Sequence, residues 1–277
     1  MRAMQYQRYG GPEQLRLVDV PRPVPGPRQL LVRVAACAVN PIDWKLHDGS
    51  YRWFAPVRFP STPGFDLAGD VVEVGAEVRR FHPGDAIYAM ADVRPGGACA
   101  EYAVISERAA AYRPANLSAI EAAAIPVAGL TALQSLRDLG HMRAGQRVLV
   151  IGAAGGVGHY AAQLAHAWGT DVTAVCGPRH VEMVRGLGAD RVIDYTREPN
   201  YLAPARFDLR LDTVVRAPPG RLLAALRPLG IYVATLPSAA RVAAALALPL
   251  VSGKRVLVAS VKPRGGDLEL LRGLCEA

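Results

Sequence analysis

A glycine-rich segment, Gly152-Ala153-Ala154-Gly155-Gly156-Val157-Gly158, has the residue types and spacing of a phosphate-binding turn. It follows the apolar run 147–151, which predicts a buried strand, and it opens a predicted helix over 158–168. Glycines at such a turn let backbone amides approach a pyrophosphate, and the helix N-terminus adds partial positive charge. The segment predicts a dinucleotide site. The turn is a variant of the usual pattern because Ala153 replaces the first glycine. The alternative interpretation is that the glycines serve only to form a tight turn between strand and helix.

The next predicted strand covers residues 171–175. The residues that follow it indicate which nicotinamide dinucleotide binds. NAD sites place an acid there to bond the ribose hydroxyls, whereas NADP sites omit the acid and supply arginine for the 2′-phosphate. This chain continues Cys176-Gly177-Pro178-Arg179-His180, without an acid. Arg179, with help from His180, therefore predicts NADPH as the cofactor. A solvated loop arginine is the alternative interpretation.

The elements that must position these residues change in character near residue 118. Before it, prolines and glycines separate short apolar segments, as in a compact β-rich barrel. The predicted strands there cover residues 30–35, 70–74, 86–89 and 100–105. After it, Ser118 and Glu121 form a capping box that opens an alanine-rich helix, which Pro126 and Gly129 are expected to interrupt before residues 130–139 resume it.

Strands and helices then alternate from residue 147 onward, which predicts a parallel, doubly wound sheet with its ligand at the carboxyl ends of the strands. Beyond the two strands already named, a helix is expected over 181–187 and strands over 191–193, 209–211, 231–234 and 255–259. We also expect a final helix over 267–274. The predicted fold class is therefore α/β with an additional β-barrel domain.

The amino-acid composition limits which kinds of protein and which partners the sequence is compatible with. A chain of 277 residues with 51% hydrophobic and 20% charged residues predicts two globular domains. Thirty-two basic and 24 acidic residues leave a net charge of +8, but the arginines are scattered, so no nucleic-acid partner is expected. No apolar run reaches about 18 residues and the first residues lack the apolar core of a signal peptide. We expect a cytosolic protein without a membrane partner.

Several further motifs carry a resemblance to a known family. They are Val39–Lys45 (VNPIDWK), Pro63–Gly69 (PGFDLAG), Pro83-Gly84-Asp85, Gly129–Ala132 (GLTA), the 153–158 turn, and Leu187–Asp190 (LGAD) followed by Asp194-Tyr195. Through nearly its whole length the chain resembles the zinc-free branch of the medium-chain dehydrogenase/reductases, the quinone oxidoreductase and enoyl reductase group. The resemblance implies a GroES-like β-barrel catalytic domain over 1–118, a Rossmann NADP-binding domain over 119–277, an active site in the cleft between them, and a homodimer.

A catalytic zinc is not expected. Where the zinc-dependent branch carries a cysteine and a histidine, this chain has Asn40 and Phe65, neither of which is a zinc ligand. The four cysteines lie far apart without a C-x-x-C pair, so the sequence predicts neither a thiolate zinc site nor a disulfide framework. The sequence therefore predicts no metal-binding residue.

Without a metal, the accessible chemistry is hydride transfer from NADPH to a quinone or to the β-carbon of an α,β-unsaturated carbonyl. The resemblance places Asn40 as a donor to developing oxygen charge and Tyr51 as proton donor, with a tyrosine that only packs on substrate as the alternative. Asp43 is expected to fix the loop that carries Asn40 rather than to act as an acid, and Lys45 to assist an oxyanion or to face solvent.

The resemblance also extends the set of expected cofactor residues beyond the turn, to Thr131 near the nicotinamide and Tyr195 beside the adenosine. The whole predicted set is Asn40, Thr131, Ala153, Gly155, Gly156, Val157, Gly158, Cys176, Arg179, Tyr195 and Thr213.

The chain also departs from the family pattern. Val215 and Arg216 replace glycines that often follow Asp212-Thr213-Val214, and the usual C-terminal return to the catalytic domain is expected to be missing. These departures sustain a second hypothesis, a nucleotide-binding reductase scaffold that serves as a non-redox binding or regulatory protein.

Overall fold

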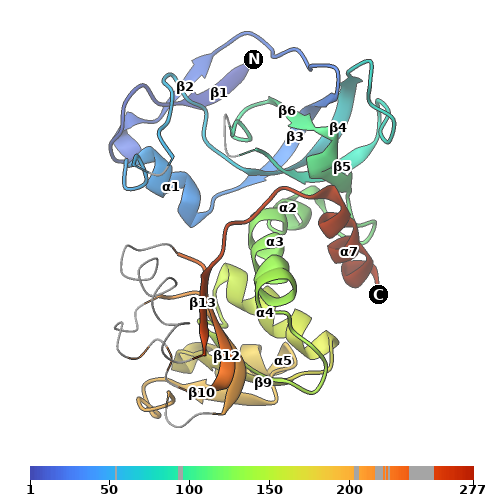
Figure 1. Cartoon of the computed structure of the whole chain (residues 1–277). Coiled ribbons are helices and arrows are strands. Elements are labelled where there is room, and N and C mark those ends of the chain that lie inside the picture. The colour runs from blue at the N-terminus through green and yellow to red at the C-terminus, as the bar shows by residue number, and fades with distance from the viewer. Residues whose placement is uncertain are drawn as a thin grey trace. The chain divides into compact units, whose positions relative to one another are not determined.

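Residues 1–53, 55–92, 96–202, 206–215, 221, 223, 225–236 and 253–277 are described by the computed structural model. They form two units, of which the first contains Met1–Leu130 together with Lys262–Ala277 and the second contains Thr131–Val261. Figure 1 shows the elements of both units. Arg216, singled out in the sequence, lies outside the described residues.

The first unit is built mainly from antiparallel strands. A two-stranded sheet pairs β1 with β2, and a five-stranded sheet has the order β6-β3-β4-β5-β7. The strands are β1 (Arg2–Gln5), β2 (Arg16–Asp19), β3 (Gln29–Ala38), β4 (Asp66–Val74), β5 (Ala86–Met90), β6 (Tyr102–Ser106) and β7 (Ala110–Tyr112). Backbone bridges from Ala3 to Ala100 and from Tyr6 to Ser61 attach the small sheet to the rest of the unit.

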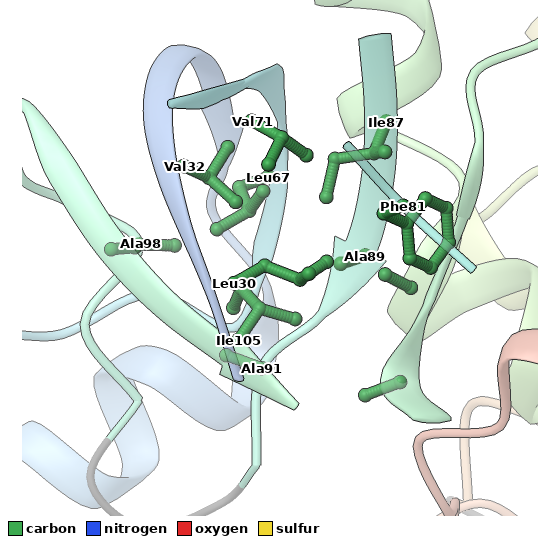
Figure 2. Close-up of a cluster of buried hydrophobic side chains, with 13 residues drawn as sticks. Leu30, Val32, Leu67, Val71, Phe81, Ile87, Ala89, Ala91, Ala98 and Ile105 are labelled. Atoms are coloured by element: carbon green, nitrogen blue, oxygen red, sulfur yellow. The ribbon is translucent and has the colours of Figure 1, made fainter. Parts of the chain in front are cut away.

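Alternating apolar side chains of these strands form one buried cluster, drawn in Figure 2. Leu30 and Val32 from β3 contact Leu67 and Val71 from β4, with Ile87 from β5. Their exposed fractions are all at or below 1%. Burial of aliphatic side chains contributes about 1.5–3 kcal/mol each, so this cluster holds the sheet in the register that brings the ends of β3 and β4 together.

Short helices join the strands of the first unit and lead toward the second. They are α1 (Pro41–His47), α2 (Ala119–Ala123) and α3 (Pro126–Gln134), the last continuing as a π-helical turn over Ser135–Leu139. The predicted capping box is confirmed: the Ser118 hydroxyl accepts from the Glu121 N–H at 3.3 Å, and the Ser118 N–H donates to the Glu121 carboxylate at 2.9 Å.

Gly129 does not interrupt the helix as the sequence suggested, because it lies inside α3. Helical glycine costs about 1 kcal/mol relative to alanine, and here the absence of a side chain admits a close neighbour. A Cβ at this position would lie 3.0 Å from Cδ1 of Leu271, which belongs to α7 (Gly265–Glu276). Tertiary packing thus overrides the local helix-breaking signal.

The second unit contains a six-stranded parallel sheet of order β10-β9-β8-β11-β12-β13. Its strands are β8 (Arg147–Ile151), β9 (Asp171–Cys176), β10 (Arg191–Asp194), β11 (Phe207–Asp212), β12 (Leu226–Ala234) and β13 (Arg255–Val258). Numbered from β8, this is the 3-2-1-4-5-6 order of the Rossmann fold, with the reversal of strand order between β8 and β11. The predicted parallel, doubly wound sheet is confirmed. Helices α4 (Gly156–Ala167) and α5 (Val181–Gly186) follow β8 and β9.

The C-terminal helix α7 groups with the first unit, whereas the sequence assigned it to the Rossmann domain and expected no return to the catalytic domain. Leu268 and Leu271 are buried on α7, and the hydroxyl of Tyr88 from β5 donates to the Leu268 carbonyl at 2.5 Å. Asn116 donates to the Cys275 carbonyl at 2.7 Å. Sequence periodicity identified the helix but not the surface that covers its apolar face.

We expect Leu268→Ala to lower the free energy of unfolding by about 2–5 kcal/mol, because the side chain is fully buried and its loss leaves a cavity. Leu274→Ala on the same helix is the control, since that leucine is 44% exposed and should change stability by less than about 0.5 kcal/mol. Urea denaturation followed by tryptophan fluorescence measures both. Equal effects of the two substitutions would contradict the packing of α7 described above.

Candidate functional site

The turn after β8 is held against the neighbouring strand by backbone bonds. The N–H groups of Gly152 and Ala153 both donate to the Val175 carbonyl of β9, each at 3.0 Å. Gly152 has a φ of +79°, a conformation that favours glycine. A Cβ there would also lie 2.4 Å from the Thr213 hydroxyl oxygen, so the turn is shaped by both neighbours of β8 in the sheet.

Gly158 sets the approach of α4 to the strand. A Cβ at this position would lie 2.1 Å from the Gly152 carbonyl oxygen and 2.8 Å from the Ala153 Cα, distances that no side chain can occupy. The helix therefore starts directly over the end of β8, with Gly155 at its N-cap. Gly155 and Gly156 are exposed, Val157 is half-buried and Ala153 is fully buried. Exposed amides at the N-terminus of a three-turn helix form a cradle suited to a pyrophosphate.

The other predicted cofactor residues of the second unit lie mostly at the carboxyl ends of adjacent strands. Cys176 ends β9, and its carbonyl accepts from the N–H of Tyr195, which follows β10 and is 51% exposed. Thr213 follows β11 and donates its hydroxyl to the Ile151 carbonyl at 2.8 Å. Because parallel strands end at one edge of the sheet, the topology brings these residues to the side where the glycine turn lies.

Arg179 lies in a short 3-10 turn, Pro178–His180, just beyond β9, and both Arg179 and His180 are exposed. The turn contains no acid, so no carboxylate at this position repels a 2′-phosphate. Thr131 lies elsewhere in the unit, on α3, and is 8% exposed. The structure thus gathers the strand-end residues at one edge of the sheet, while Thr131 belongs to a different element.

In the first unit, Asn40 is the N-cap of α1 and its side chain is held by a buried acid. The Asn40 amide nitrogen donates to the Asp66 carboxylate at 2.8 Å. The other Asp66 oxygen accepts from the Val127 N–H at 2.8 Å, and Asp66 is completely buried at the start of β4. An amide nitrogen carries two N–H donors, so this bond uses one and fixes the direction of the other.

Asp43 holds the backbone around Asn40. One of its carboxylate oxygens accepts from the Asn40 N–H at 2.6 Å, and the other accepts from the Gly64 N–H at 3.1 Å. Burial raises the pKa of Asp43 to about 6, although its backbone hydrogen bonds oppose the shift. Burial likewise raises the pKa of Asp66 well above its ordinary value. We call Asn40, Asp43 and Asp66 the acid–amide network.

Lys45 and Tyr51 form a second group beside this network. The Lys45 ammonium nitrogen lies 5.3 Å from the centre of the Tyr51 ring, and the Tyr51 N–H donates to the Lys45 carbonyl at 3.1 Å. Burial raises the pKa of the Tyr51 phenol and lowers the pKa of the Lys45 ammonium. Among the described residues, no hydrogen bond joins Tyr51 to Asn40, so the structure brings together two pairs of predicted residues rather than all four.

A cavity of about 940 Å³ lies in the first unit, and Asp43 forms part of its wall. Tyr6, Leu46 and Phe65 contribute apolar surface, and Gln5 and Arg58 contribute polar groups. Ligand sites are commonly cavities of this size with a mostly apolar lining and few polar groups. Asp43 therefore borders a space large enough for a small organic molecule, whereas Asn40, Lys45 and Tyr51 are not among the residues that line it.

Asp66 is a residue of the candidate site that the sequence analysis did not single out. It belongs to the Pro63–Gly69 motif, and an acid beside Leu67 and Ala68 at the start of a buried strand is the signal that could have identified it. Within the described ranges no cluster of three or more histidine, cysteine, aspartate or glutamate side chains has the arrangement of a metal site. No helix among the described residues is long and apolar enough to cross a bilayer.

Comparisons with known proteins agree with this fold. Residues 26–115 match the family model described as "Alcohol dehydrogenase GroES-like domain". The chain is 47% identical over 201 residues to a chloroplastic quinone-oxidoreductase homolog of Spinacia oleracea, covering 70% of this chain and 61% of the relative. It is 36% identical over 223 residues to an NADPH-dependent alkenal/one oxidoreductase of Arabidopsis thaliana, covering 77% of this chain and 57% of the relative.

Among solved structures, the quinone oxidoreductase from Coxiella burnetii is 31% identical with a TM-score of 0.87, and the match covers 100% of this chain and 87% of that one. This chain thus spans about three fifths of the length of the spinach relative but most of the bacterial structure.

The predicted cytosolic location is contradicted by these comparisons, because the spinach and Arabidopsis relatives are both named as chloroplastic. The prediction rested on the lack of a long apolar run and of an apolar signal core. Transit peptides for organelles are amphipathic and rich in arginine and serine, so hydropathy does not detect them.

The raised pKa of Asp43 predicts how stability changes with pH. Between its ordinary value of 3.8 and its folded value of about 6, the folded state binds more protons than the unfolded state. The stability contributed by this group is therefore fully present below about pH 3.8 and is lost as the pH rises through about 6. The raised pKa of Asp66 changes the stability of the fold with pH in the same direction.

We expect carbon-13 NMR to show an aspartate carboxyl that titrates near pH 6 and disappears in Asp43→Asn. The stability of that variant should fall less steeply across this pH window than that of the native chain. Asp48→Asn, at the exposed C-terminal end of α1, should leave the signal in place. Persistence of the titration in Asp43→Asn would show that another carboxyl is responsible.

Proposed function

Because this chain belongs to the medium-chain dehydrogenase/reductase family, in its zinc-free quinone oxidoreductase and enoyl reductase group, we propose that it is an NADPH-dependent oxidoreductase that reduces a quinone or an α,β-unsaturated carbonyl. The observation that carries the proposal is the glycine turn at the point where the strand order of a parallel sheet reverses. The spinach and Coxiella proteins are named for quinones and the Arabidopsis relative for alkenals and alkenones.

The residues of the second unit suit the cofactor. Backbone amides at the start of α4 would hold the pyrophosphate, and Arg179 would pair with the 2′-phosphate. Tyr195, half exposed at the end of β10, would border the adenosine. Bound NADPH supplies a hydride, and no amino-acid side chain can carry out that transfer.

The first unit supplies the groups that an acceptor needs. A quinone and an enone both gain negative charge on oxygen when they accept a hydride at carbon. The second N–H of the Asn40 amide would donate to that oxygen, because Asp66 fixes the orientation of the amide. Asp43 holds the backbone of Asn40 and does not transfer a proton in this proposal.

Tyr51 would deliver the proton that completes reduction of an enone. Burial raises the pKa of its phenol, which keeps the proton in place at neutral pH, and the nearby Lys45 ammonium would stabilise the phenolate left behind. The mostly apolar cavity bordered by Asp43 suits a flat acceptor such as a benzoquinone or a short enone.

The proposal is tested by mixing the protein with NADPH and following the loss of the reduced-nicotinamide absorbance with a benzoquinone, a simple enone and an enoyl thioester. We expect turnover with at least one of the three acceptors. Tight NADPH binding with no turnover on any of them would favour the alternative of a non-redox nucleotide-binding protein. Failure to bind NADPH would contradict both hypotheses.

Arg179→Ala should weaken NADPH binding by about 10- to 150-fold, since a charge-assisted bond contributes about 1.5–3 kcal/mol. NADH binding should change by less than about twofold, because NADH has no 2′-phosphate. Calorimetric titration measures both. Arg185→Ala on α5, where the arginine pairs with Glu182, is the matched control for lost surface charge. An equal loss for the two cofactors would reject the phosphate role.

Tyr51→Phe should lower kcat for the enone by about 100-fold with KM nearly unchanged, because general acid catalysis contributes about 10²–10⁴ and the ring remains. Trp53→Phe is the control, since Trp53 lies nearby and is 82% exposed. Steady-state kinetics with saturating NADPH measure the effect. A kcat that does not change would leave Tyr51 as a packing residue.

A further inference from the structure

Two cysteines that are far apart in the sequence meet in the first unit. Cys37 lies near the end of β3, and Cys99 lies three residues before β6. The antiparallel register that pairs Arg33 with Tyr102, continued beyond the paired residues, would place Cys37 opposite Ala98, the residue next to Cys99. Their sulfur atoms are 3.7 Å apart.

The backbone holds Cys99 in this position from both sides. Its N–H donates to the Pro63 carbonyl at 3.0 Å, and its carbonyl accepts from the Met4 N–H at 2.9 Å. Gly64 passes close to the sulfur, since a Cβ at that glycine would lie 2.8 Å from the Cys99 Sγ. Cys37 is fixed by the pairing of β3 with β4, opposite Leu67. The two thiols therefore face each other without a change in backbone.

Cys37 also differs from the other three cysteines in its exposure and in the direction of its pKa shift. Its thiol is exposed, whereas Cys99 and Cys275 are half-buried and Cys176 is buried. A hydrogen bond from Cys99 stabilises the Cys37 thiolate and lowers the pKa of Cys37 to about 7, while the charge of Asp43 opposes this shift. The pKa values of the other three thiols are raised above their ordinary value. A thiolate is the attacking form in thiol–disulfide exchange, and Cys99 stands where a resolving thiol must stand.

A disulfide has an S–S length of about 2.0 Å, so the sulfurs must approach by about 1.7 Å, a distance that side-chain rotation supplies. We propose that Cys37 and Cys99 form a reversible dithiol–disulfide site that is oxidised by low-molecular-weight disulfides. The Cys37 thiolate attacks one sulfur of the small disulfide and forms a mixed disulfide, releasing one thiolate. The Cys99 thiol loses its proton and attacks the Cys37 sulfur, which releases the second thiolate. The protein dithiol loses two electrons and two protons, and the small disulfide becomes two thiols.

The cross-link would join two segments that flank the acid–amide network. Cys37 lies three residues before Asn40 on the same stretch of chain, and Cys99 bonds to Pro63, whose neighbour Gly64 donates to Asp43. This placement does not depend on the proposed function. The modification would be a property of the first unit, whichever acceptor or cofactor the protein takes.

The test uses the full chain, reduced and then treated with glutathione disulfide, with intact-mass and peptide-mapping mass spectrometry. The native chain should lose the mass of two hydrogen atoms, with Cys37 cross-linked to Cys99, and dithiothreitol should reverse the change. Cys99→Ser should accumulate one glutathione on Cys37, because the resolving thiol is missing. Cys37→Ser should react at least about tenfold more slowly than Cys99→Ser. The double variant Cys176→Ser, Cys275→Ser is the control and should form the same cross-link as the native chain.

Three results would overturn the proposal. The native chain could keep a glutathione adduct without forming a cross-link, the cross-link could join another pair of cysteines, or Cys37→Ser could react as fast as Cys99→Ser. The peptide map of the native chain does not depend on any variant, so it decides the first two outcomes even where a substitution impairs folding.

Discussion

The backbone of α4 passes so close to the end of β8 that only glycine can occupy position 158. This steric constraint determines where the helix begins, because any side chain at Gly158 would collide with the Gly152 carbonyl and push α4 away from the strand. Once the helix is fixed there, its first amides face outward at the reversal of strand order between β8 and β11. The ends of β9, β10 and β11 then supply the surrounding residues. The outward-facing amides on which the proposed nucleotide site depends follow from this one close approach.

The first unit depends on a different kind of interaction, two buried carboxylates that hold one asparagine, Asp43 by its backbone and Asp66 by its side chain. Burying an aspartate raises its pKa and costs free energy, which hydrogen-bond donors must offset. Asp43 receives two backbone N–H groups, and Asp66 receives the Asn40 amide and the Val127 N–H. These bonds connect α1, the start of β4 and the start of α3. This cost fits a positioning role, since an apolar side chain in place of Asp66 could not orient the Asn40 amide and one in place of Asp43 could not hold the Asn40 backbone.

The sequence predicted the parts that depend on local patterns. Short apolar runs identified β3 and β8, the Ser118–Glu121 box identified the start of α2, and the glycine turn identified the β8–α4 crossover. Contacts between distant segments could not be predicted in this way. Gly129 was expected to break a helix because nothing local shows that Leu271 packs against it. The meeting of Cys37 and Cys99 and the bond between Asn40 and Asp66 arise from strand register, which a single sequence does not determine.

The cofactor class is also easier to infer than the acceptor, for a physical reason. A pyrophosphate is bound by backbone amides whose placement is set by glycines and by strand order, so its signature is compact and continuous in the sequence. An acceptor is bound by side chains from separate loops. The cavity bordered by Asp43 is lined by Gln5, Arg58 and Phe65, three residues from three different segments of the first unit. Under the proposed function, substitutions at such positions would change which acceptor fits without disturbing the turn. Relatives with this fold are accordingly named for quinones in some cases and for alkenals in others. The glycine turn, in contrast, can be recognised directly in this sequence.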